Sequence, residues 1–155
     1  ITDKLPAEIE REARFTKAKA LLELNRTEDA FDEFARVSSN TKTAEGAESK
    51  YNMAKIYLEA GEFEKAENEI FSFAEQNTPQ QYWLAKSFIL LADIYEQRDD
   101  FFQAKATLQS VIDGYAILDD GIIDLASDRI SELVRAEKLK QQGADADTVK
   151  VQWTF

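Results

Sequence analysis

The chain has 155 residues, of which 44% are hydrophobic and 32% charged, and this length can enclose the core of one globular domain. Five glycines and two prolines are few for a β-rich protein, so we expect an all-α fold. A net charge of −11 repels phosphate backbones and excludes nucleic acid as an expected partner. The absence of histidine and cysteine removes the usual general bases, nucleophiles and zinc ligands.

Three segments of the chain, at about residues 8–40, 44–78 and 80–115, repeat one pattern at spacings of 36 and 38 residues. The first half of each carries a small residue where close helix packing requires one, at Ala18, Ala54 and Ala92. A residue that tolerates the left-handed conformation follows, at Asn25, Gly61 and Asp99. The second half carries another small residue and an apolar stripe, at Ala30, Phe34 and Val37, at Ala66, Ile70 and Phe73, and at Ala104, Leu108 and Val111. Each segment therefore predicts a helical hairpin that must stack on its neighbours to bury its stripe.

Two further segments follow the repeats. Apolar residues at helical spacing between Ile123 and Val134 predict one more amphipathic helix over about 120–142, which we expect to cap the third hairpin. The rest, about 143–155, alternates apolar and polar residues at its end, which favours an extended or disordered tail. Two outcomes are open for its apolar positions, Val149, Val151, Trp153 and Phe155. The tail either docks on a helical surface of its own or of a neighbouring copy, giving weak self-association, or it is a disordered end.

The repeated positions resemble those of the tetratricopeptide repeat (TPR) family over about residues 8–115. The resemblance is carried by Ala54, Tyr57, Gly61, Phe63, Ala66 and Ile70, with counterparts in the third unit. The first unit departs from the family's aromatic, glycine and aromatic with Leu21, Asn25 and Thr27. The resemblance implies seven helices, three hairpins plus a cap, stacked as a right-handed α–α superhelix that serves as a protein-interaction module.

The links between the units are longer than those of the usual 34-residue repeat. In this respect they resemble bacterial envelope TPR proteins, which implies a periplasmic or envelope-associated location. Because the chain begins at Ile1 rather than Met, we expect it to be a piece of a longer protein, which the resemblance implies to be bacterial. No apolar run approaches the roughly 20 residues that span a bilayer, so we expect no membrane insertion.

The first helices of stacked hairpins line a concave groove. Helical spacing predicts its lining as Phe15, Lys19, Tyr51, Lys55, Lys86, Ile89 and Asp93. An apolar row of Phe15, Tyr51 and Ile89 then lies beside a cluster of lysines. In an acidic protein such lysines favour a peptide that carries a carboxylate, unless they only solvate the helix faces.

The chaperone-binding branch of the family clamps a C-terminal carboxylate with basic and amide residues on these same helices. Asn52 and Lys86 stand at matching positions, whereas Phe15 and Leu90 replace the lysine and arginine of that clamp, and Lys19 replaces an asparagine. The resemblance therefore adds Asn52 to the candidate groove and implies an incomplete clamp.

Other features indicate structural roles. The pairs Asp99–Asp100 and Asp119–Asp120 adjoin expected helix ends, where aspartate caps helices, and Trp83 is expected to pack on the preceding hairpin. All glycines are isolated, so no phosphate loop is present. We therefore expect no enzymatic activity, metal or cofactor. Two functions are open: a module that binds a partner segment in its groove, or a structural spacer within a long repeat array with no ligand of its own.

Overall fold

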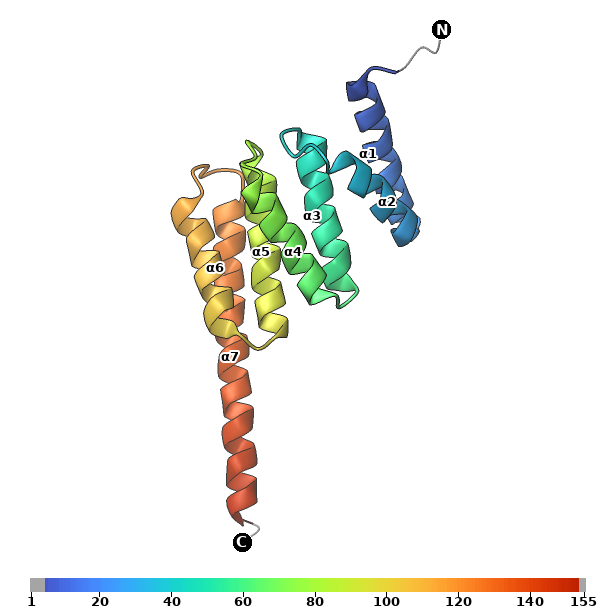
Figure 1. Cartoon of the computed structure of the whole chain (residues 1–155). Coiled ribbons are helices and arrows are strands. Elements are labelled where there is room, and N and C mark those ends of the chain that lie inside the picture. Colours follow the sequence, from blue (N-terminus) through green and yellow to red (C-terminus); the bar gives the residue numbers. More distant parts are fainter. Residues whose placement is uncertain (1–4, 154–155) are drawn as a thin grey trace.

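The computed structural model describes residues 5–153, with side chains described as far as Asp145. This part of the chain contains seven α-helices and no β-strand. The helices are α1 (Ala7–Glu23), α2 (Thr27–Val37), α3 (Ala44–Glu59), α4 (Phe63–Glu75), α5 (Gln81–Gln97), α6 (Phe101–Gly114) and α7 (Ile122–Trp153). They pair as three antiparallel hairpins stacked side by side, with α7 packed on the third (Figure 1). The all-α superhelical solenoid expected from the sequence is confirmed.

Buried alanines allow the two helices of each hairpin to approach closely. All six repeated alanines, at Ala18, Ala30, Ala54, Ala66, Ala92 and Ala104, are no more than 1% exposed. The apolar positions four and seven residues after the second alanine of each pair are also buried: Phe34, Val37, Ile70, Phe73, Leu108 and Val111. Small and large side chains therefore alternate in the core in the same register in all three hairpins.

The turn inside each hairpin has a left-handed residue, as predicted. Asn25, Gly61 and Asp99 have φ values of 59°, 75° and 60°. The N–H that follows each of them donates to a carbonyl five residues back at 2.9 Å, as in the bond from Arg26 to Leu21. This closure satisfies the last carbonyls of the first helix and reverses the chain.

The two long links between hairpins are hydrogen-bonded to each other. Thr78 Oγ1 donates to the Thr41 carbonyl at 2.6 Å, and Thr41 Oγ1 donates to Gln76 Oε1 at 2.5 Å. Gln80 Nε2 donates to the Lys42 carbonyl at 3.1 Å. Thr41 and Thr78 are 4% and 3% exposed, so the extra residues of the links form a buried polar seam.

The first part of α7 covers the third hairpin, as expected of a cap. Ile122, Ala126 and Leu133 are at most 1% exposed and belong to the apolar cluster formed with α5 and α6. Lys105 of α6 pairs with Glu137 of α7 at 2.6 Å.

The end of α7 differs from the sequence-based expectation. The backbone is helical to Trp153, whereas we expected the helix to stop near residue 142 and an extended or disordered tail to follow. No glycine or proline interrupts residues 144–153, and propagating a helix costs less than starting one. A single alternating segment, by contrast, has no strand to pair with. Phe155 and the side chains of Val149, Val151 and Trp153 lie outside the described part of the structure, so docking of the tail stays a prediction.

Replacing Ala66 by tryptophan tests the helix crossings. Ala66 is fully buried in the middle hairpin, so we expect Ala66→Trp to lower the free energy of unfolding by about 1–3 kcal/mol or more, or to unfold that hairpin. Urea unfolding followed by circular dichroism measures the change. Ala106→Trp, at an exposed helical position, is the matched control, and equal losses in the two variants would contradict the crossing argument.

Replacing Gly46 by alanine tests the packing of the first long link against α3. A Cβ atom on Gly46 would lie 1.9 Å from the Asn40 carbonyl oxygen, and the backbone there cannot move without breaking the cap from Gly46 N to Thr43 Oγ1 at 3.1 Å. We expect Gly46→Ala to destabilise the fold by about 1–3 kcal/mol. Gly143→Ala, in open space on α7, should instead be neutral or stabilise by up to about 1 kcal/mol. Thermal unfolding of both variants checks the two signs.

Candidate functional site

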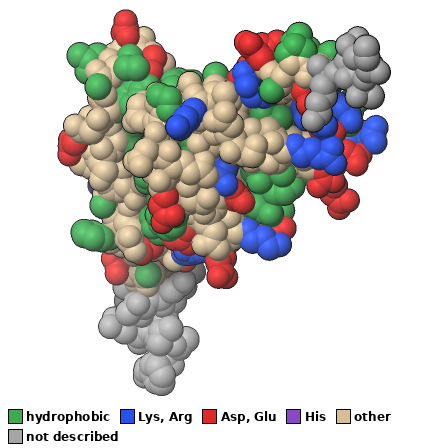
Figure 2. All heavy atoms as spheres, turned by 45° about the horizontal axis from the view of Figure 1, so that its top comes forward, with side chains coloured by type: hydrophobic (Ala, Val, Ile, Leu, Met, Phe, Trp, Pro, Cys, Tyr) green, Lys and Arg blue, Asp and Glu red, His purple; other side chains and the backbone are tan. Residues whose placement is uncertain are grey.

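The first helices of the hairpins, α1, α3 and α5, lie next to one another, and α7 continues the row beside α5. All eight residues predicted for the groove belong to α1, α3 or α5. Figure 2 shows acidic and basic side chains interspersed over the face that it draws, without one large block of either sign. The four helices α1, α3, α5 and α7 form the inner face of the stack.

Lys86 contacts more aromatic rings than the other lysines predicted for the groove. Its Nζ lies 4.9 Å from the ring centre of Tyr51, 5.3 Å from that of Trp83 and 5.7 Å from that of Tyr82. The Tyr51 and Trp83 rings are 5.4 Å apart, so Trp83 packs on the preceding hairpin, as predicted. No carboxylate among the described residues forms an ion pair with Lys86. Burial, and then the charge of Lys55, lower the pKa of the Lys86 ammonium.

The other two predicted lysines are less available. Lys19 Nζ lies 3.6 Å from Glu48 and 5.2 Å from the ring centre of Phe15, which in turn packs on Phe34. Lys55 Nζ is 4.0 Å from Glu59, at the outer limit of an ion pair. Among the three predicted lysines, Lys86 is therefore the one without an ion pair to a carboxylate of the described residues, and the pair of Lys55 is a long one.

The remaining predicted residues divide between the groove and the core. Tyr51 and Asn52 are half-buried on α3. Burial, and then the charge of Asp93, raise the pKa of the Tyr51 hydroxyl, which keeps that hydroxyl protonated. The prediction that Ile89 lines the groove is wrong: it is 6% exposed and packs in the cluster with α6 and α7, because α7 covers that side of α5.

The end of the inner face next to α7 is acidic. Arg129 of α7 binds Asp93 and Glu96 of α5 at 2.6 Å each, and it binds Glu132 of its own helix at 2.5 Å. Three carboxylates thus surround one guanidinium. A hollow of about 520 Å³ adjoins this network, between Leu58, Gly61 and Glu96.

Sequence reasoning missed Arg129 and Tyr82 as members of this surface. A signal for Arg129 was present, because Asp93 and Glu96 share a helix face, where two like charges repel each other unless a cation lies between them. Tyr82 also had a signal, since it lies four residues before Lys86 on one helix face, from which its ring reaches the ammonium.

No group of three or more acidic side chains is arranged to hold a metal ion within the described part of the chain. Aspartates of both pairs cap helices, as predicted: Asp100 accepts from Gln103 N at 3.0 Å, and Asp120 accepts from Ile122 N at 3.2 Å. Among residues 5–153, no helix combines the length and apolar character needed to cross a bilayer.

Comparison with known families agrees with this geometry. Residues 81–116, which span α5 and α6, match a family model described as tetratricopeptide repeat, and residues 47–70, on α3 and α4, match another of the same description. Two of the three hairpins thus match tetratricopeptide repeats. No curated protein matches it significantly. The TPR hairpins indicate a protein–protein interaction module, and this repeat fold is typically a non-enzymatic scaffold.

Substitution of Arg129 tests the acidic network. Burial raises the pKa of Asp93, and Arg129 opposes that rise. An acid with a raised pKa favours folding at low pH, and this contribution is lost as the pH rises through the raised value. Arg129→Gln removes the opposing charge, so we expect a loss of about 1–3 kcal/mol in unfolding free energy at neutral pH that shrinks in acid.

Urea unfolding at neutral and acidic pH measures this dependence. Arg135→Gln removes the same charge from an exposed position of α7 and should have little effect at either pH. A loss for Arg129→Gln that does not change with pH would contradict the role assigned to Asp93.

Proposed function

We propose that this TPR protein binds a segment of a partner protein along its inner face, and that a carboxylate of the partner pairs with Lys86 and Lys55. The observation that carries the proposal is the environment of Lys86. Its ammonium is partly desolvated, surrounded by three aromatic rings and without a carboxylate partner among the described residues. A carboxylate that forms a charge-assisted hydrogen bond with a buried cation stabilises it by about 1.5–3 kcal/mol.

The neighbouring groups favour a particular ligand. Tyr51 and Trp83 form an apolar wall beside Lys86, which suits an apolar or aromatic residue next to the carboxylate. Asn52 brings an amide on the same helix as Tyr51. Farther along α5, Asp93 and Glu96 disfavour a second acidic residue, so the segment binds with its acidic part at the Lys86 end.

The competing function is a structural spacer within a longer repeat array. One observation favours it: α7 exposes Leu125 and Leu139, at 41% and 68%, on the same side of the helix, and a further hairpin could cover them. The resemblance to bacterial envelope TPR proteins is compatible with both functions. We also propose that the longer protein to which this chain belongs is located in the bacterial envelope.

Selection from a displayed library of random peptides tests groove binding, because it samples many sequences at once and needs no identified partner. We expect the selected peptides to carry a carboxylate beside an apolar residue, and Lys86→Glu or Lys55→Glu to weaken their binding at least about tenfold. Lys65→Glu makes the same change of charge at an exposed position of α4 and should bind like the wild type.

Two results would remove the groove proposal. Either no peptide is enriched, or the enriched peptides bind Lys86→Glu as tightly as the wild type. The spacer function would then be the better account of the chain.

A further inference from the structure

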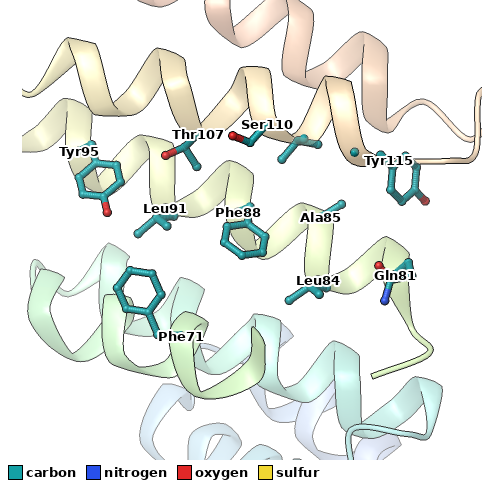
Figure 3. A pocket seen from close by; sticks show the side chains of 12 residues that line it. Phe71, Gln81, Leu84, Ala85, Phe88, Leu91, Tyr95, Thr107, Ser110 and Tyr115 are labelled. Atoms are coloured by element: carbon teal, nitrogen blue, oxygen red, sulfur yellow. The ribbon is translucent and has the colours of Figure 1, made fainter. Parts of the chain in front are cut away.

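A second hollow lies on the outer side of the stack, away from the inner face. It has a volume of about 370 Å³ and opens between α4 and α6, with α5 as its floor. Figure 3 shows Phe71 of α4 facing Phe88 and Leu91 of α5, with Tyr95 at one end and Tyr115 at the other. Phe71 is 41% exposed, so the hollow, hereafter the outer groove, presents aromatic surface to solvent. Its volume lies within the range of pockets that take a ligand or anchor side chains.

The equivalent place one repeat earlier has different side chains. There Lys50 occupies the position that corresponds to Phe88, and it pairs with Glu69 of α4 at 2.5 Å. Phe31 of α2 packs on Tyr57 with ring centres 4.9 Å apart and closes that site. At the later site the residue that corresponds to Phe31 is Glu67, which pairs with Arg98 instead. The outer groove is therefore a local departure from the repeat, and no general feature of stacked hairpins produces it.

One end of the outer groove is acidic. Asp113 lies next to Gly114 and Tyr115 of the lining, and the Tyr115 hydroxyl donates to Asp120. Glu75 lies one helical turn beyond Phe71, toward the same end. Neither Glu75, Asp113 nor Asp120 pairs with a lysine or arginine among the described residues. A fitting occupant is therefore apolar, with a basic group beside its anchors.

The chain contains such a segment at its C-terminal end. The sequence VKVQWTF, residues 149–155, combines two valines, two large aromatic residues and Lys150. The backbone of α7 carries residues 149–153 away from the three hairpins (Figure 1). An ion pair of Lys140 with Asp99 joins α7 to the third hairpin, and residues 141–153 extend roughly 20 Å beyond it at 1.5 Å per residue. While α7 is helical, the segment cannot reach the outer groove of its own chain.

We propose that the outer groove binds residues 149–155 of a second copy of the chain. The aromatic anchors of that segment fill the space between Phe71 and Phe88, and Lys150 meets the acidic end near Asp113. This contact is separate from the inner face, so the protein binds its own copy and a partner segment at different surfaces.

Sedimentation equilibrium of the full chain tests the proposal. We expect reversible self-association that both Phe71→Glu, which alters the groove, and Trp153→Ala, which alters the segment, weaken at least about tenfold. A mixture of these two variants should regain association, because one supplies an intact segment and the other an intact groove. Phe102→Glu removes an aromatic residue that is 80% exposed on α6 outside the groove, and it should associate like the wild type.

A fluorescein-labelled peptide of residues 144–155 provides the second measurement. It should bind full-length Trp153→Ala and lose at least about tenfold in affinity for Phe71→Glu or Phe71→Ala, with circular dichroism and melting temperature showing that each variant is folded. A monomeric wild type, a Phe71→Glu variant that associates normally, or a mixture that stays monomeric would overturn the proposal. So would peptide binding that Lys86→Glu abolishes and Phe71→Glu leaves intact, which would place the segment on the inner face.

Discussion

The close approach of two helices at a pair of buried alanines is the contact on which this structure depends. Larger side chains at Ala54 or Ala66 would separate α3 from α4, and the left-handed turn at Gly61 would then no longer bring their stripes together. Because the same approach recurs three times, the first helices stand side by side. Residues 35 or more positions apart in sequence, such as Tyr51 and Lys86, therefore meet on one surface.

Both candidate surfaces arise where the residues at equivalent positions differ between the repeats. The inner face has a cation in an aromatic setting at one end of α5 and a cluster of carboxylates around Arg129 at the other. The outer groove is lined by Phe88, where the equivalent residue one repeat earlier is the ion-paired Lys50. No single hairpin contains either surface, so function here depends on the order in which unlike repeats are stacked.

The sequence predicts those parts of the fold that depend on local spacing. The buried alanines, the turn at Asn25 and the capping role of Asp100 follow from residues within one hairpin, and all are confirmed. The errors involve α7. Ile89 was placed in the groove because periodicity alone does not show that α7 covers that side of α5. The extended tail was inferred from a short alternation, which did not outweigh the continuity of the preceding helix.

The hydrogen-bonded seam between the links bears on how the stack comes apart. In a linear repeat protein each unit contacts only its neighbours, so end units fray while inner ones persist. Here the segment that enters the middle hairpin and the segment that leaves it share bonds through Thr41 and Thr78. When one segment opens, buried polar groups of the other lose their hydrogen-bond partners, which costs about 1–3 kcal/mol of free energy for each group. The two ends of the middle hairpin are thereby coupled, so we expect the amide protons of the two links to exchange with solvent together.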